Sequence, residues 1–292
     1  MKKILLPLML MFGANVACAE APKPLLWKVS DADNSLYLLG SFHMLKPGDY
    51  PLAKSTDVAF ADAEQLYFEL SPEEMNNPAL GQKMAQAAMR TDGKTLQQSV
   101  SADTWKKFET YAAKHNLPVA NFQGFEAWFV GLILTVTEMQ KIGLDPALGL
   151  DKHFMDRAAK AGKPGKGLET GDSQIAIFDG MSAQQQEQFL LEALDDSAEI
   201  KAKMDDLHNT WRKADDKTLF DKMAMDMRKK YPELYQSINP DRNKAWLPKL
   251  EALLATNKSD DILVVVGALH LVGDDGVVKM LTEKGYKIER MK

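Results

Sequence analysis

The chain has 292 residues, with 36 Lys and Arg against 41 Asp and Glu, 45% hydrophobic residues and one cysteine, a composition typical of folded globular proteins. A chain of this length buries roughly three quarters of its unfolded surface, so its fold needs neither a metal nor a disulfide. The formal charge of −5 and the pI of about 5.6 lack the basic excess that phosphate backbones attract, so no nucleic-acid partner is expected.

The first nineteen residues have the pattern of a secretory signal peptide. Two lysines precede an apolar run from Ile4 to Phe12, and Ala17 and Ala19 lie at the positions that a signal peptidase reads. The run is shorter than the about 20 residues that span a bilayer, and no later segment is long enough either. We therefore expect a signal peptide at 1–19 and a periplasmic or secreted protein without stable membrane insertion.

Cys18 leaves a second interpretation open. A cysteine after small residues can be the cleavage and acylation site of a lipoprotein, but Asn15 stands where such sites usually have leucine. Cleavage after Ala19 would instead remove the only cysteine and leave a chain from Glu20 with a charge of −7. The mature protein would then have no thiol for catalysis or for binding a metal, which suits an oxidising compartment.

The predicted elements alternate between strand and helix near both ends of the chain and are mostly helical between them. Strands are expected at 25–30, 36–39, 66–70, 166–169, 261–266 and 286–291, and helices at 55–65, 72–90, 101–115, 123–141, 150–161, 182–195, 198–213, 217–229, 242–255 and 277–284. Residues 31–34 predict a hairpin turn between the first two strands. The β-branched run 261–266 predicts a strand covered on both faces.

This order of elements predicts an α/β (α+β) fold. A mixed central sheet would form from the first 70 residues, a piece near 165 and the last 30, with a large, mostly helical insertion at about 72–240. The sheet and the insertion together would make one domain over residues 20–292.

Four predicted strands end in a residue that can bind a metal or transfer a proton, namely His43, Glu69, Glu169 and His270. Ligands of open α/β sheets bind beyond the carboxyl ends of the strands, so these side chains are expected to converge. A glycine stands three residues before each histidine and would let the chain turn sharply, through positive φ or close backbone approach.

Two histidines and two glutamates suit a hydrolytic site with a divalent metal, in which imidazole and carboxylate bind the metal and another carboxylate takes a proton from bound water. Manganese, cobalt and zinc all suit such ligands. The alternative is structural, because a single Gly-x-x-His arises by chance and a histidine after a strand is often a capped structural residue. Two copies, together with two glutamates at strand ends, favour the functional interpretation.

The other histidines are not expected in this site. His115 ends a helix, His208 lies on a polar helical face, and both are predicted at the surface, while His153 lies on a helix near Asp156. The chain has no Gly-rich phosphate loop, no His-Glu-x-x-His and no Gly-x-Ser-x-Gly, so the usual nucleotide, zincin and serine-hydrolase classes are unsupported.

Methionines are frequent, and several have helical spacing, as at Met223, Met225 and Met227. Because methionine is unbranched and flexible, these residues predict either gap-filling core or a pliable apolar groove rather than a redox cluster.

Five motifs together resemble those of the TraB/GumN family, which is similar to the Tiki metalloproteases. They are Leu38–Met44 (LLGSFHM), Gly149–Asp151 (GLD), Gly167–Thr170 (GLET) with Gln174, Arg242–Asn243, and Val266–Gly273 (VGALHLVG) with Gly276. They occur in the family's order over nearly all of the mature chain. The resemblance implies a core shared with Tiki-type and erythromycin-esterase-like proteins.

The resemblance also implies that His43, Glu69, Glu169 and His270 form the active site. Arg242 matches a further family motif, in which an arginine could hold a substrate carboxylate or an active-site glutamate. The Tiki proteins that the chain resembles are metal-dependent peptidases anchored in membranes.

Our first functional hypothesis is an exported metal-dependent hydrolase, peptidase-like, that acts on a peptide or a small envelope-derived substrate. His43 and His270 with one glutamate would hold the metal, and the other glutamate would be the general base; the sequence does not assign which. In a metal-free variant, a histidine oriented by a glutamate activates water directly. The alternative is a non-catalytic periplasmic binding protein for a peptide or envelope component, and the oligomeric state is left open.

Overall fold

The computed structural model describes residues 20–194, 197–256 and 260–292. The predicted signal peptide and the lipoprotein alternative at Cys18 both lie outside the described residues. None of the described helices is both long and apolar enough to cross a membrane.

Six strands form one mixed sheet in the order β4-β3-β5-β2-β1-β6. The strands are β1 (Leu26–Ser30), β2 (Ser35–Ser41), β3 (Gln65–Phe68), β4 (Gly165–Gly167), β5 (Ile262–Gly267) and β6 (Lys287–Met291). β1 pairs antiparallel with β2 and with β6, whereas β2, β5, β3 and β4 are parallel to one another. The predicted mixed sheet from the two ends of the chain and a piece near 165 is therefore confirmed.

Strand β5 lies between β2 and β3, and all six of its residues are buried. Its β-branched side chains suit a strand that is covered on both faces. Because the four neighbouring strands are parallel, their carboxyl ends lie at one edge of the sheet. This edge carries the four predicted site residues.

The helices are more numerous than the sequence indicated. They are α1 (Lys54–Asp62), α2 (Pro72–Met75), α3 (Pro78–Ala87), α4 (Leu96–Ser99), α5 (Ala102–Lys114), α6 (Ala127–Lys141), α7 (Leu150–Ala161), α8 (Gly171–Asp179), α9 (Ala183–Ala193), α10 (Ser197–Arg212), α11 (Asp216–Phe220), the π-turn η4 (Asp221–Met225), α12 (Asp226–Lys230), α13 (Pro232–Ile238), α14 (Pro240–Thr256) and α15 (Val277–Glu283). Short 3₁₀ turns are η1 (Pro47–Asp49), η2 (Val119–Phe122), η3 (Pro146–Leu148) and η5 (Ala268–His270).

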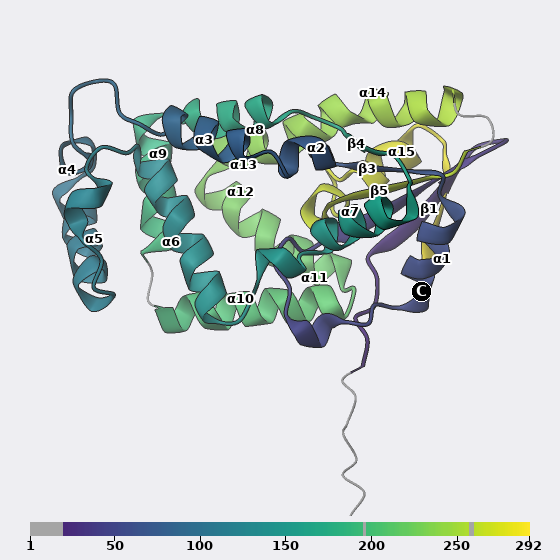
Figure 1. Ribbon diagram of the computed structural model, residues 1–292, viewed down its shortest axis with the longest axis horizontal. Helices are drawn as coiled ribbons and strands as arrows, with labels where there is room; N and C mark the ends of the chain where they lie inside the picture. Colours follow the sequence, from purple (N-terminus) through teal and green to yellow (C-terminus); the bar gives the residue numbers. More distant parts are fainter. Residues whose placement is uncertain (1–19, 195–196, 257–259) are drawn as a thin grey trace, which may run out of the picture.

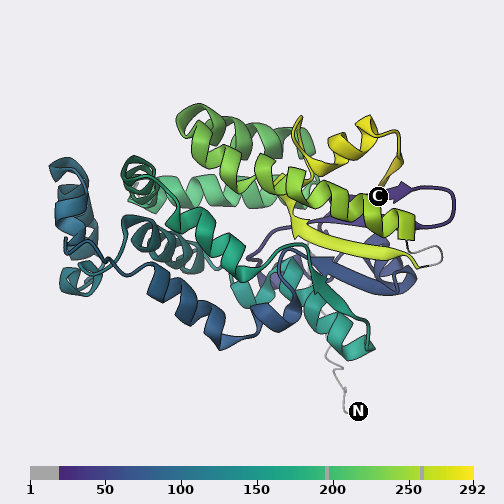
Figure 2. The ribbon, with the colours of Figure 1, turned by 90° about the horizontal axis from the view of Figure 1, so that it is seen from above.

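The sheet and the helical insertion lie end to end. Figures 1 and 2 show α14 along one face of the sheet and α7 with α1 on the other, while α3 to α6, α9, α12 and α13 lie beyond the carboxyl ends of the parallel strands. One apolar core joins the sheet to α7, α10 and α14 through Phe154, Trp211 and Trp246. A second core lies between α5, α6 and α9. The helical insertion therefore faces the edge of the sheet at which the site residues gather.

The observed helices differ from the predicted ones in two respects: one predicted helix is divided, and some helices were not predicted. The single helix expected at 72–90 is two helices, because the side chain of Asn77 accepts from the amide of Ala79 and Pro78 takes the first turn of a new helix. Helices α8 and α13 were not expected. Thr170 and Ser173 form a capping box that starts α8 directly after the Gly-Leu-Glu segment.

Candidate active site

The four predicted residues converge at the carboxyl edge of the sheet. Nε2 of His43 lies 3.7 Å from Oε1 of Glu69, and Nε2 of His270 lies 3.9 Å from the same oxygen. Glu169 follows β4 and is joined to Glu69 through a shared partner, Arg242. The predicted convergence of the four side chains is confirmed.

Arg242, on the first turn of α14, binds both glutamates. Its Nη2 donates to Oε2 of Glu69 at 2.6 Å and to Oε1 of Glu169, and its Nε donates to both oxygens of Glu169 at 3.1 Å. Its Nη1 donates to Nε2 of His270 at 2.9 Å. Of the two roles that the sequence left open for this arginine, the structure shows the one that holds glutamates.

The groups around Glu69 keep it ionised. Burial alone would raise the pKa of this carboxyl, but His270, His43 and Arg242 together with the amide of Gly267 lower it well below its ordinary value. Burial would equally lower the pKa of Arg242, and the two glutamates raise it instead. The guanidinium and the carboxylates thus form a buried network in which each charge is paired.

Because Gly267 has no side chain, His43 and Glu69 can both approach its backbone. Its amide donates to Oε1 of Glu69 at 2.8 Å, and an added Cβ would lie 3.0 Å from Nε2 of His43 and 3.1 Å from that oxygen. Its φ of −49° is one that any residue adopts. Of the two reasons predicted for this glycine, close approach is therefore the correct one. At Gly40 an added Cβ would lie 2.9 Å from Cβ of Leu25, so close packing applies there too.

Asn243 fixes the tautomer of His270. The amide nitrogen of Asn243 donates to the backbone carbonyl of Asp275 at 2.8 Å, so its side-chain oxygen must accept from Nδ1 of His270, 2.7 Å away. Nε2 of this imidazole is left with its lone pair, which accepts from Arg242. Burial lowers the pKa of His270 to about 3, against an opposing rise from Glu69.

His43 is oriented by a carboxylate that the sequence analysis did not include among the site residues. Oδ1 of Asp151, at the start of α7, lies 3.0 Å from Nδ1 of His43 and accepts from the hydroxyl of Ser41 at 2.6 Å. Desolvation lowers the pKa of His43, but Asp151 and then Glu69 raise it above its ordinary value. The His43 side chain is 56% exposed, so its Nε2 can meet a substrate or water.

Asp151 could have been found from its motif. Gly149-Leu-Asp151 was noted as a segment, and the structure explains its glycine: an added Cβ would lie 2.1 Å from the backbone oxygen of His43. Only a glycine lets α7 begin this close to the loop after β2. The aspartate two residues later then faces the imidazole.

Glu169 has two further partners, and a cleft opens beside it. Nε1 of Trp246 donates to its Oε2 at 3.2 Å, and the amide of Gln174 donates to its Oε1 at 2.7 Å. An open cleft of about 620 Å³, between α8 and α14, is lined by Glu169 and Arg242 together with the hydroxyls of Thr170 and Ser173. A substrate can therefore approach these groups from solvent.

The donor types suit manganese, cobalt or zinc, but the arrangement does not fit a metal. Across residues 20–194, 197–256 and 260–292, no group of three or more His, Cys, Asp or Glu side chains is placed to hold a metal ion. The physical reason is Arg242, which already takes the lone pair of Nε2 of His270 and one oxygen of Glu69. A cation among these groups would also stand beside the guanidinium.

The remaining histidines lie outside the site, and one prediction about them is wrong. His208 is not at the surface: its side chain is 6% exposed, and Nε2 lies 2.7 Å from Oδ2 of Asp49. His115 ends α5 as expected but is partly buried, with its ring 4.3 Å from that of Tyr111. His153 packs on the ring of Tyr50, 4.7 Å away.

The fold and site define a mixed α/β protein with two histidines and two glutamates joined through an arginine at the carboxyl edge of its parallel strands. The sequence model of the TraB/PrgY/gumN family matches residues 25–290, and the chain belongs to this family. The family resemblance drawn from the motifs is confirmed.

Two curated relatives are similar over most of their length. The chain is 24% identical to the uncharacterized protein YbaP of Escherichia coli (strain K12) over 253 residues, which cover 84% of this chain and 87% of YbaP. YbaP of Shigella flexneri matches to the same extent. No solved structure matches the chain.

Proposed function

We propose that this member of the TraB/PrgY/gumN family is a hydrolase of ester or amide bonds in which His43 is the general base. The observation that carries the proposal is the pair formed by Asp151 and His43. One imidazole nitrogen is fixed to a buried carboxylate and the other is open to solvent beside Glu69, an arrangement suited to activating water.

The proposed reaction needs water and one proton carrier. Nε2 of His43 takes a proton from water while the water oxygen bonds to the carbonyl carbon of the substrate. The bond to the leaving alcohol or amine then breaks, and the imidazolium returns the proton to that group. Asp151 keeps the ring in place and balances its charge, and Ser41 holds Asp151. Arg242 is a positioning residue that fixes Glu69 and Glu169.

The amino-terminal pattern supports an exported enzyme, so we propose the periplasm or the cell exterior as its compartment. A peptide, or another small ester or amide derived from the cell envelope, is the proposed substrate class. The open cleft lined by Glu169 and Arg242 would admit such a molecule to that side of the site.

A metal-dependent hydrolase is the second candidate. It is favoured by two possible ligand atoms, Nε2 of His43 and Oε1 of Glu69, which lie 3.7 Å apart. Both border the space beside Gly267 that a side chain would otherwise fill. This candidate requires Arg242 to move away from His270, because the guanidinium occupies the lone pair that a metal would need.

The experiment is a hydrolysis screen of the purified protein with peptide libraries and 4-nitrophenyl esters, after dialysis against chelator and again with added manganese, cobalt or zinc. Hydrolysis that survives chelation and is lost in His43→Ala but not in the control His153→Ala supports the proposal. Activity that needs added metal assigns the second candidate. Binding of a screened peptide or ester without turnover would identify a binding protein and overturn both.

A further inference from the structure

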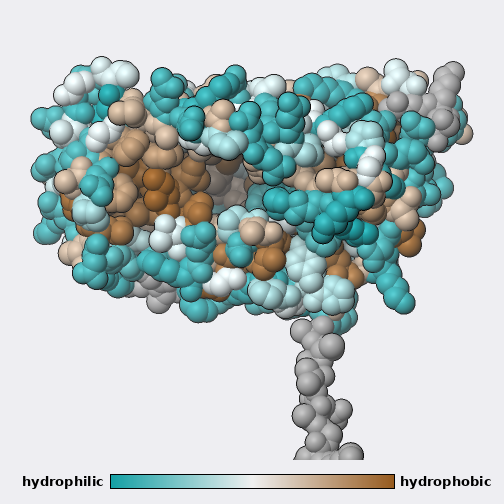
Figure 3. Space-filling view, viewed as in Figure 1, coloured by the Kyte–Doolittle hydropathy of each residue, from teal (hydrophilic) through white to brown (hydrophobic). Residues whose placement is uncertain are grey.

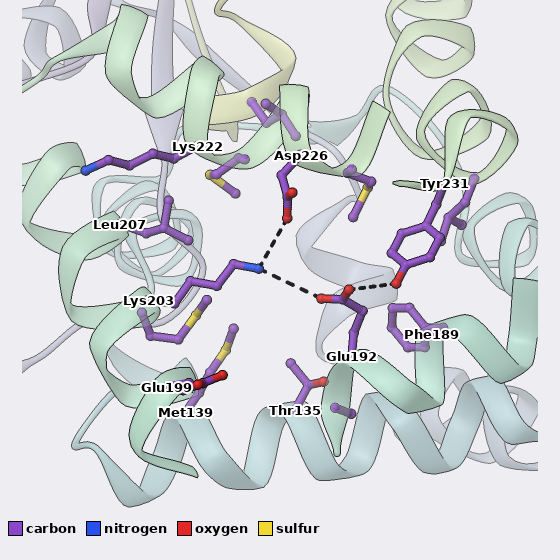
Figure 4. A pocket seen from close by; sticks show the side chains of 16 residues that line it. Thr135, Met139, Phe189, Glu192, Glu199, Lys203, Leu207, Lys222, Asp226 and Tyr231 are labelled. Atoms are coloured by element: carbon purple, nitrogen blue, oxygen red, sulfur yellow. Dashed lines mark hydrogen bonds and ion pairs between the residues drawn. The ribbon is translucent and has the colours of Figure 1, made fainter. Parts of the chain in front are cut away.

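An apolar cavity lies in the helical insertion next to the candidate active site. It measures about 470 Å³ and is lined by side chains from α6, α9, α10, η4, α12 and α13. Four methionines contribute to its wall (Figure 4), and we call it the methionine cavity after Met139, Met204, Met223 and Met227. Figure 3 shows apolar side chains gathered in a hollow over this part of the molecule.

One lining residue ties the cavity to the site. Leu269 lies in the turn after β5, two residues after Gly267 and one before His270. The other lining residues belong to the helical insertion. A molecule in the methionine cavity would therefore contact the same turn that carries the buried imidazole.

Three of the charged groups that line the cavity, Lys203, Glu192 and Asp226, pair with one another. Nζ of Lys203 lies 3.8 Å from carboxylate oxygens of both Glu192 and Asp226 (Figure 4). Lys230 approaches the same two acids, at 3.6 and 3.1 Å. These groups are 30 to 49% exposed, so they form a partly solvated and nearly neutral rim. The rim does not select a strongly charged ligand, and the wall behind it is apolar.

The wall favours an aliphatic chain over a peptide backbone. An extended peptide needs partners for its own N–H and C=O groups, as an open strand edge provides. Apart from Tyr231 and Leu269, the lining residues belong to helices or to the π-turn, whose backbone groups largely bond within the same element. An acyl chain has no such groups to satisfy, and flexible methionine side chains adapt to its shape.

We propose that the methionine cavity binds the acyl chain of the substrate, which makes the substrate class an ester or amide of an aliphatic acid. This inference rests on the proposed hydrolase function. The chain would occupy the cavity and reach the turn at Leu269, and the carbonyl group would lie toward His43.

The first test measures binding without turnover. cis-Parinaric acid, a fluorescent long-chain fatty acid, is titrated into His43→Ala alone and into His43→Ala combined with Met223→Trp, Met139→Trp or Met225→Trp. Met225 is the matched control, because it lies in the same π-turn as Met223 but is 45% exposed and does not line the cavity.

Filling the cavity at Met223 or Met139 should weaken binding at least about tenfold, because the bulkier indole takes space in which methylenes of the probe would otherwise be buried. Met225→Trp should leave the affinity within about twofold, because a surface substitution changes little. No binding to His43→Ala, or equal affinity in all variants, would overturn the inference. Displacement of the probe by an apolar peptide but not by decanoic acid would assign the cavity to peptides and also overturn it.

The second test needs no variant and separates this inference from the proposed function. The value of kcat/KM for 4-nitrophenyl acetate, hexanoate and decanoate should rise with chain length in the wild-type protein. Equal rates for all three esters would contradict the acyl-chain inference while supporting the hydrolase. Binding of the probe without hydrolysis of any ester or amide would contradict the hydrolase and leave the cavity as a binding site for aliphatic chains.

Discussion

Oδ1 of Asp151 lies 3.0 Å from Nδ1 of His43, although 108 residues separate them in the chain. One residue follows a strand of the sheet and the other begins a helix that covers it. The carboxylate leaves Nε2 as the nitrogen that can act on a substrate.

Replacing Asp151 with Asn should shift the pH dependence of hydrolysis. The carboxylate raises the pKa of His43, so the imidazolium persists above neutrality and kcat/KM should rise with pH as the neutral base forms. Asp151→Asn removes this effect, moves the rising limb to lower pH and lowers its plateau. The control is Asp156→Asn on the same helix, whose side chain is 50% exposed. An unchanged profile in Asp151→Asn would remove His43 from the role of general base.

Gly267→Ala should lower the rate by up to about 10²-fold with little effect on the backbone. The new methyl group would stand 3.0 Å from Nε2 of His43 and 3.1 Å from Oε1 of Glu69, so both groups must move. A misplacement of about 1 Å costs about 10²-fold in rate, and the shift required here is a few tenths of an ångström, so this figure is the upper limit. Gly48→Ala is the control, since its Cβ would meet nothing within 4 Å. Rates measured on one ester decide the matter, and equal rates in the two variants would show that the space at Gly267 is not used.

Arg242→Gln should destabilise the fold strongly. The change leaves the carboxylates of Glu69 and Glu169 without their buried cation, a loss of about 3–5 kcal/mol for partners of this kind. Arg228→Gln, at an exposed position on α12, should change the free energy of unfolding by less than about 0.5 kcal/mol. Urea unfolding measures both.

A second substitution separates charge from packing. Adding Glu169→Gln to Arg242→Gln removes one of the orphaned carboxylates, so part of the lost stability should return. If the double variant is no more stable than Arg242→Gln, unpaired charge is not the cause of the loss.

The buried pair of Asp49 and His208 predicts a pH-dependent contribution to stability. Burial would raise the pKa of Asp49, but His208, the amide of Lys46 and Arg212 lower it. A carboxyl whose pKa is lower in the folded than in the unfolded state stabilises the fold above its ordinary pKa, and that stabilisation disappears as the pH falls through the lower value.

The wild-type protein should therefore be more stable than Asp49→Asn at pH 7, and the difference should shrink below about pH 4. Urea unfolding of both proteins at pH 7, 5 and 3 tests this, with the exposed Asp57→Asn as control. A difference that is constant across this range would show that the Asp49 side chain contributes packing rather than charge.

The sequence predicts which four residues meet at the site, but not the hydrogen bonds that Asp151 and Arg242 make with them. Each of His43, Glu69, Glu169 and His270 lies at or shortly after the end of a predicted strand, and the parallel alignment of those strands brings them to one edge. The hydrogen bond from His43 to Asp151 depends on how closely α7 approaches the sheet, which is a packing property. The contacts of Arg242 with the two glutamates also depend on packing. The sequence predicts α14 to start at 242, whereas the helix starts at Pro240 and carries Arg242 in its first turn.

Helix patterns misled where polarity was read as exposure. The polar helical face around His208 predicts exposure, yet its imidazole is buried against Asp49 from another segment. The methionine spacing predicts either gap-filling core or an apolar groove, and the structure divides these residues: Met223 and Met227 line a cavity, whereas Met225 is exposed. The spacing of residues within one helix does not show which other segment of the chain packs against each of its faces.

The position of β5 determines when the site can exist during synthesis. Its neighbours β2 and β3 are made long before the strand that lies between them, and the hydrogen bond from Gly267 to Glu69 joins residues 198 positions apart. Until then both early strands present unpaired edges, which favour association with other chains. A nascent chain that stops before residue 262 has neither the central strand nor the His270 turn, so the candidate site is incomplete until both have been made.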